Sequence, residues 1–176
     1  EPAQPVAFKQ AGVVKAWKVY KHKLTFGKGQ TLALVDDGCT LSMPEWSKSD
    51  GDQPKVLVTY DSMDGDDDPS HEGKGYHGST VGIPSSVNYK GRWGVAYNNQ
   101  VAVIRALECC HGNVSDGKTL AAGLQWIIDN HKRYRITTVN LAPVDDKAHD
   151  QPVASAIDSK LTTLRQLGIW VSAPAG

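Results

Sequence analysis

Two short motifs carry a carboxylate and an imidazole that could act together in catalysis. Asp36 and Asp37 close an apolar run and precede Gly38, and His77 opens the small-residue segment HGSTVG at 77–82. An aspartate that orients a histidine acting as a general base is two thirds of a nucleophilic triad, and the two groups need only be neighbours in space. Each motif alone has a simpler interpretation, because Asp-Gly favours a turn and a lone histidine is usually a surface or capping residue.

The elements that must position these residues follow from hydrophobic periodicity. Short apolar runs bounded by polar loops predict strands, and apolar residues at helical spacing predict amphipathic helices. The predicted strands cover residues 31–35, 55–60, 101–107, 136–142 and 169–176, and the predicted helices cover residues 8–20, 120–131 and 153–167.

Strands and helices alternate along most of the chain, which predicts an α/β fold with a parallel β-sheet and helices on both faces. Ligands of such sheets bind at the carboxyl ends of the strands. That rule selects Asp36 and Asp37, the acidic segment 61–68, and the segment 140–146 as candidate functional positions.

The charge pattern excludes some classes of partner. The 19 Lys and Arg balance the 19 Asp and Glu, but residues 36–72 hold eleven acidic residues and only two lysines. A zero balance argues against a nucleic-acid binder, which would normally be basic. No apolar run approaches the roughly 18 residues that a membrane helix needs. We therefore expect neither a nucleic-acid nor a membrane partner.

The motifs resemble those of the subtilisin-like serine peptidases, or subtilases, in collinear order along nearly the whole chain. The resemblance implies a subtilisin-like fold and a serine endopeptidase that hydrolyses polypeptides through an Asp-His-Ser triad, with Asp36 and His77 as catalytic residues. Asp37 is the weaker candidate for the aspartate, and His71 for the base. The matching segments are GKGQTLALVDDG (27–38), YHGSTVG (76–82), GVAYNNQVAVIRAL (94–107), TTVNLAP (137–143) and GIWVSAPAG (168–176).

The resemblance places the serine and the oxyanion asparagine beyond Gly176, and no serine of the chain lies in a G-T-S or G-x-S-x-G context. Residues 1–176 are thus expected to be the N-terminal part of a single subtilase peptidase domain, with a fold incomplete at the C-terminus. Such a chain should be inactive by itself. Asn140, Leu141 and Ala142 match the family's substrate-lining strand.

Some segments look more like the kexin and furin branch, namely Asp-Asp-Gly, the acidic tract 64–69, GVAYN (94–98) and PVDD (143–146). That likeness implies that Asp37 and Asp145 receive a basic side chain of the substrate through charge-assisted hydrogen bonds. For Asp145, polarity before a helix is the simpler alternative. The family resemblance also implies a secreted or extracytoplasmic protein. The three cysteines, Cys39, Cys109 and Cys110, match neither a disulfide framework nor a zinc spacing.

No cofactor is expected for the chemistry, but a structural calcium ion has two candidate locations. Clustered carboxylates at 64–68 suit a hard cation, although a solvated loop explains them equally well. Glu45 stands where the family often has a calcium-binding aspartate, whereas the loop 85–93 is shorter than the family's usual calcium loop.

Two other functions stay open at the level of sequence. The first is a non-catalytic subtilase-like protein that binds a peptide or a partner protein. The second is an unrelated α/β module that binds a metal or another ligand through the acidic loop, although the chain lacks the glycine motifs of nucleotide-binding domains.

Overall fold

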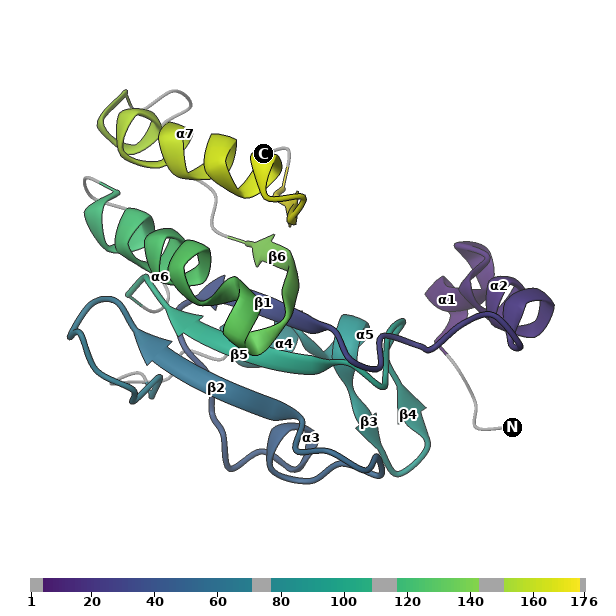
Figure 1. Ribbon diagram of the computed structural model, residues 1–176. Helices are drawn as coiled ribbons and strands as arrows, with labels where there is room; N and C mark the ends of the chain where they lie inside the picture. The colour runs from purple at the N-terminus through teal and green to yellow at the C-terminus, as the bar shows by residue number, and fades with distance from the viewer. Residues whose placement is uncertain (1–4, 71–76, 109–116, 143–150, 175–176) are drawn as a thin grey trace.

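The computed structural model describes residues 5–70, 77–108, 117–142 and 151–174, with side chains described from residue 155 in the last range. A five-stranded sheet in the order β2-β5-β1-β6-β7 forms the centre of the molecule, and every pairing in it is parallel (Figure 1). Its strands are β1 (Thr31–Asp36), β2 (Val56–Asp61), β5 (Gln100–Arg105), β6 (Ile136–Leu141) and β7 (Trp170–Ser172).

Strand β1 is the central strand, and all six of its residues are buried. Successive side chains of a strand point to opposite faces of a sheet, so β1 contributes to two separate apolar clusters. Ala33 and Val35 belong to the larger cluster, and Leu32 and Leu34 belong to the smaller one. A run that is apolar at every position is what burial on both faces requires.

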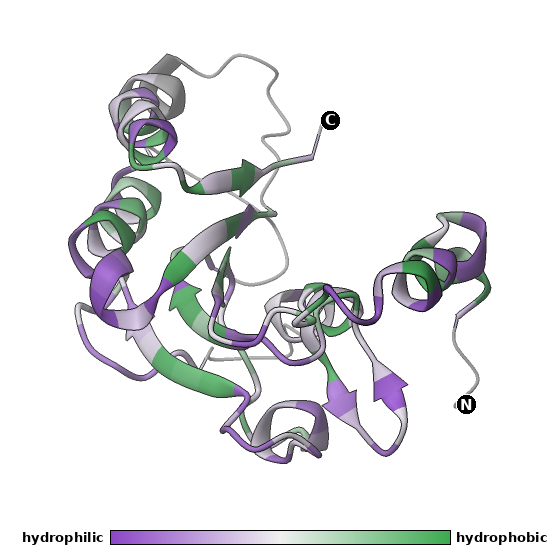
Figure 2. Ribbon diagram, turned by 45° about the vertical axis from the view of Figure 1, so that its right-hand side comes forward, coloured by the Kyte–Doolittle hydropathy of each residue, from purple (hydrophilic) through white to green (hydrophobic). Residues whose placement is uncertain are grey.

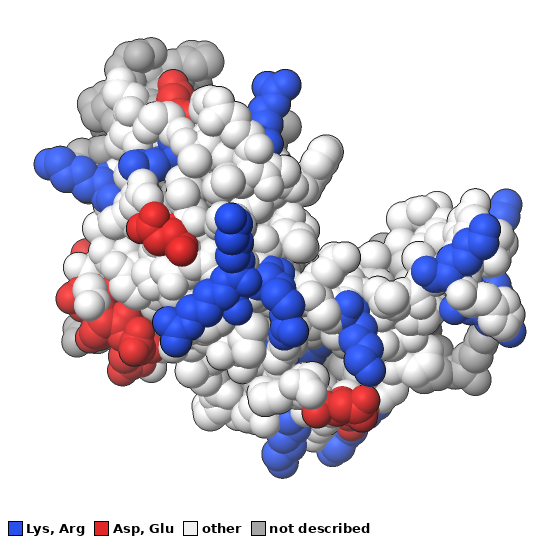
Figure 3. All heavy atoms as spheres, viewed as in Figure 1, with Lys and Arg blue, Asp and Glu red and all other residues white. Residues whose placement is uncertain are grey.

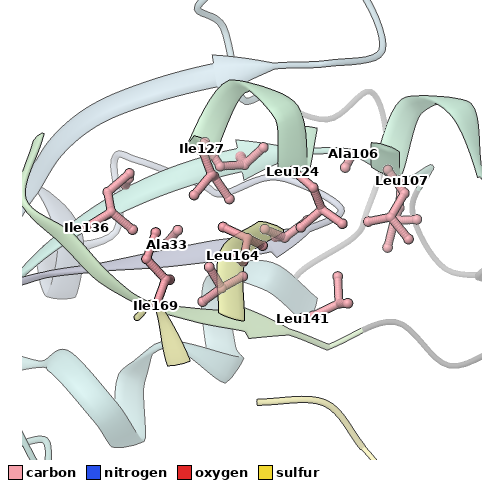
Figure 4. Packing of buried hydrophobic residues seen from close by; sticks show 14 residues of the cluster. Ala33, Ala106, Leu107, Leu124, Ile127, Ile136, Leu141, Leu164 and Ile169 are labelled. Carbon is pink, nitrogen blue, oxygen red and sulfur yellow. The ribbon is translucent and has the colours of Figure 1, made fainter. Parts of the chain in front are cut away.

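Helices cover both faces, as the alternating pattern predicts. On one face, α6 (Lys118–Tyr134) and α7 (Gln151–Gln166) lie side by side (Figure 1), and Leu124 and Ile127 of α6 and Leu164 of α7 pack into the larger cluster (Figure 4). Among the described residues, three short helices lie on the other face, beside the smaller cluster: α3 (Pro44–Ser47), α4 (His77–Val81) and α5 (Ile83–Ser86). The predicted α/β fold is therefore confirmed.

The predicted N-terminal helix is wrong as a single element. It is divided into α1 (Val6–Gln10) and α2 (Val13–Tyr20), because Gly12 between them adopts the left-handed conformation with φ of 76°. Neither helix has a buried residue, and both lie apart from the central sheet (Figure 2). The amphipathic pattern of residues 8–20 therefore belongs to two short surface helices and not to a helix of the core.

An aromatic cluster attaches α2 to a hairpin that the sequence did not predict. The hairpin consists of β3 (Asn88–Tyr89) and β4 (Arg92–Trp93). The indole of Trp17 makes edge-to-face contacts with Trp93 and Tyr97, and its Nε1–H donates to the carbonyl of Val95 at 3.2 Å.

Charged groups are distributed unevenly over the surface. Acidic side chains gather beyond the C-terminal end of β2, and lysines lie on α1 and α2 at the other side of the molecule (Figure 3). Within the described residues, no helix combines the length and the apolar character needed to cross a membrane.

Candidate active site

Asp36 and His77 meet although 41 residues separate them in the sequence. Asp36 is the last residue of β1 and His77 is the first residue of α4. The imidazole Nδ1 lies 2.7 Å from Asp36 Oδ1 and 2.9 Å from Oδ2. The Asp36 side chain is 5% exposed and that of His77 is 59% exposed. The carboxylate is thus buried, whereas one side of the ring is open.

Two glycines of the HGSTVG segment allow α4 to lie directly on β1 and the loop after it. A Cβ atom at Gly78 would come within 2.1 Å of the Gly38 carbonyl oxygen, and one at Gly82 would come within 2.5 Å of a Leu34 methyl group. Both distances are shorter than real Cβ contacts, so a side chain at either position would force its neighbours to shift. The small residues that follow His77 in the sequence therefore bring the imidazole to Asp36.

The electrostatics of the pair assign the histidine tautomer. Burial raises the pKa of Asp36, while the hydrogen bonds from His77 and from the Asp37 N–H oppose that rise. The hydrogen bond to Asp36 raises the pKa of His77 above its usual value. A carboxylate can only accept a hydrogen bond, so Nδ1 carries the proton and Nε2 of the neutral ring is the free base.

Asp37 has a different position from the one that sequence reasoning assigned to it. Its Oδ1 accepts a hydrogen bond of 2.7 Å from the Gly78 N–H, and the residue is only 3% exposed. Its Oδ2 is buried without a hydrogen-bond partner among the described residues. This geometry holds the start of α4 and argues against the predicted contact with a basic side chain of the substrate, because the carboxylate does not face solvent.

Two residues that support the site were not identified from the sequence. Ser79 is fully buried, and its hydroxyl accepts a hydrogen bond of 2.8 Å from the Thr40 N–H. The indole N–H of Trp46 in α3 donates to the Ser79 carbonyl at 3.0 Å. These contacts tie α4 to α3 and to the loop after β1, so Ser79 is unavailable as a nucleophile.

The predicted substrate-lining residues lie at the end of β6. Asn140 and Ala142 are half-buried, whereas Leu141 is 6% exposed and belongs to the larger apolar cluster. Leu141 could thus contact a ligand only through its backbone. His71 and Asp145 lie outside the described residues, as do Asp146, Cys109 and Cys110.

The acidic segment after β2 is organised around an arginine. The Arg105 guanidinium donates to Asp61 at 2.6 Å and to Asp64 at 3.1 Å. Other carboxylates of the segment accept local backbone N–H groups, such as Asp68 from Ser70 at 2.9 Å. In the part of the chain that the structure describes, no group of three or more His, Cys, Asp or Glu side chains could hold a metal ion.

The second calcium candidate, Glu45, is engaged in an ion pair. Its carboxylate accepts a hydrogen bond from the Arg92 guanidinium of β4. Calcium takes six to eight oxygen ligands, and a guanidinium supplies none and repels the ion. The residues around Glu45 therefore do not fit the calcium ion that the family resemblance implies.

Comparison with known proteins identifies a family for most of the chain. The pattern that defines the subtilase family, a family of peptidases, matches residues 27–176. No curated protein matches the sequence.

Solved structures give a fold match. The CspB protease of Clostridium perfringens has a TM-score of 0.70 at 19% identity, covering 93% of this chain and 39% of that protein. The S41 psychrophilic protease has a TM-score of 0.64 at 19% identity, with coverages of 91% and 51%. The epidermin leader peptide processing serine protease of Staphylococcus aureus has a TM-score of 0.62 at 14% identity, with coverages of 90% and 40%. The chain thus spans about half or less of each of these structures.

Proposed function

Because the chain belongs to the subtilase family, we propose that it supplies the aspartate and histidine of the catalytic triad of a serine endopeptidase, with Asp36 and His77 in those roles. One observation carries the proposal: the buried Asp36 carboxylate and the exposed His77 ring share a hydrogen bond of 2.7 Å at the carboxyl end of the central strand. This is the edge of a parallel sheet at which ligands bind.

The chemistry follows from the tautomer. Nε2 of His77 takes the proton of a serine hydroxyl while the serine oxygen attacks the peptide carbonyl carbon. His77 then gives that proton to the leaving amine, which frees the first product and leaves an acyl-enzyme for hydrolysis by water. Asp36 holds the ring in the productive orientation and stabilises the imidazolium that exists between the two proton transfers.

The serine would come from another part of the same protein. Among the described residues, no serine hydroxyl is hydrogen-bonded to the His77 ring, and the neighbouring Ser79 hydroxyl accepts a backbone N–H instead. The 59% exposure of the His77 side chain leaves room for a nucleophile and a substrate at the other ring nitrogen. The chain alone should therefore show no peptidase activity.

We further propose polypeptides as the substrate, lying along Asn140 and Ala142 at the end of β6, and a location outside the cytoplasm. A preference for basic residues would depend on Asp145, because Asp37 is buried beneath the start of α4. Neither nucleic acid nor a membrane is expected as a partner.

Labelling of the full-length protein with a fluorophosphonate tests the proposal, since the reagent modifies only an activated serine. Replacement of His77 by alanine should abolish labelling and lower peptide hydrolysis by on the order of a million-fold. His22→Ala, at an exposed histidine after α2, is the matched control and should label like the wild type. Unchanged labelling of His77→Ala would contradict the assignment. A folded wild-type protein that never labels would favour the non-catalytic alternative.

A further inference from the structure

An ion pair joins β4 to α3, the helix whose Trp46 contacts the helix of His77. Glu45 is in the first turn of α3, and its side chain is 11% exposed. Its partner Arg92 is in β4, and the Arg92 side chain is 57% exposed. The backbone N–H of Glu45 and the Arg92 guanidinium hold the pKa of the Glu45 carboxyl below its usual range. Glu45 is therefore an anion that is largely removed from water, and Arg92 is its counter-ion.

The hairpin that carries Arg92 has a tight turn and a backbone tie to the segment after α3. Tyr89 and Arg92 are paired across the hairpin, and the turn between them consists of Lys90 and Gly91 with φ of 48° and 72°. Positive φ at both central residues is the signature of a tight hairpin turn of type I′. The Asp50 N–H donates to the carbonyl of Asn88 at 2.9 Å, which is a second tie between the hairpin and the segment after α3.

The residues around Glu45 offer few ligands to a free metal ion. A hard cation needs several oxygen ligands, but among the described residues no group of three or more acidic, histidine or cysteine side chains could hold a metal ion. A cation at Glu45 would also have to displace a guanidinium that is covalently attached to the hairpin. An attached counter-ion loses far less entropy on binding than a dissolved one.

From these contacts we propose that Arg92 takes the place of a metal ion at Glu45, so that the protein joins the β3–β4 hairpin to α3 without calcium at this position. The joined helix matters for the site above it. Trp46, the next residue of α3, donates to Ser79 of α4, and its ring lies where a Cβ at Gly82 would be 2.7 Å away. The ion pair thus stabilises the support on which the helix of His77 rests.

Thermal unfolding of the full-length protein, in calcium and in a calcium chelator, tests this proposal without any measurement of activity. Other parts of the protein could respond to calcium, so the informative quantity is the change in that response on Glu45→Gln. We expect the calcium-dependent shift in Tm to be the same in wild type and Glu45→Gln. A calcium response that Glu45→Gln removes would overturn the proposal.

The role of Arg92 itself is tested by Arg92→Met. The variant should lower Tm by about 2–4 °C in the chelator, as expected for a partly exposed ion pair. Lys48→Met removes one positive charge beside α3 and is the matched control. Adding Glu45→Gln to Arg92→Met should cost less than the sum of the single changes, because both remove the same contact. A loss no larger than that of Lys48→Met, or fully additive losses, would also overturn the proposal.

Discussion

Asp36 and Asp61 are two buried aspartates in the same structural position with different partners. Each is the last residue of a parallel strand, β1 or β2, and each is in register with Arg105 of the strand between them. Asp61 pairs with Arg105, whose side chain is 12% exposed, whereas Asp36 pairs with His77, whose side chain is 59% exposed. Residue type and strand position alone therefore do not decide which carboxylate can take part in chemistry.

The difference between the two pairs lies in the partner. A guanidinium is charged at every accessible pH, so the Asp61–Arg105 pair can hold two strands together but cannot transfer a proton. An imidazole titrates near neutral pH and has a second nitrogen. Because Asp61 engages Arg105, the Asp36 carboxylate is left to orient the histidine.

The largest expected difference between the two pairs is in peptidase activity. Asp36→Asn in the full-length protein should lower kcat/KM for a peptide substrate by about 10⁴-fold, because the amide no longer fixes the histidine tautomer. Asp64→Asn, at a mostly exposed partner of Arg105, is the matched control and should retain activity. Steady-state kinetics on both variants measure the difference. Equal losses in the two variants would remove the functional distinction between the two carboxylates.

The second expected difference is in stability, which should depend on the Asp61–Arg105 pair. Asp61→Asn should lower the free energy of unfolding by about 3 kcal/mol, because it leaves the buried Arg105 charge without its main partner. Denaturant titration gives this value for Asp61→Asn and for the double variant with Arg105→Met, which should recover part of the loss by removing the unpaired charge. If Asp61→Asn left the free energy of unfolding unchanged, the Asp61–Arg105 pair would not hold the two strands together.

The smallest effect is the pH dependence of the His77 pair. The hydrogen bond to Asp36 raises the pKa of His77, so the pair stabilises the fold fully below the ordinary histidine pKa of about 6.5. That contribution is lost as the pH rises through the higher pKa of the folded protein. NMR titration of His77 should show the raised pKa, and Asp36→Asn should lower it, while Asp61→Asn should not. A His77 pKa that is identical in all three proteins would contradict the coupling.

The sheet and the Asp36–His77 pair were predictable because they depend on local patterns. Strand β1 matches the predicted run 31–35 with one more residue at its end, which is Asp36. Burial on both faces demands an unbroken apolar run, and that demand is visible in the sequence. The collinear family motifs indicated that Asp36 and His77 meet, and the glycines after His77 are the physical reason that they can.

Other features depend on distant partners that no local pattern shows. The Arg105–Asp61 pair joins positions 44 residues apart, so Asp61 was indistinguishable from its acidic neighbours. Lys55 was assigned to an ordinary strand, but its ammonium is buried and donates to the Tyr97 and Asn99 carbonyls. The β3–β4 hairpin did leave a signal, because Lys90-Gly91 between Tyr89 and Arg92 can form its turn. The burial of Asp37 was not predicted, because exposure cannot be read from adjacency to Asp36.

The strand order also determines when the site can assemble during synthesis. The two neighbours of β1 are β5 and β6, so β1 is complete only after residue 141 has been made. At about 5–20 residues per second, roughly 5–20 s separate the synthesis of Asp36 from that of its last supporting strand. During that interval the run TLALV lacks at least one of its two partner strands, and an unpaired strand edge is a template for pairing with other chains. The topology therefore makes the central strand depend on a partner that is synthesised more than a hundred residues later.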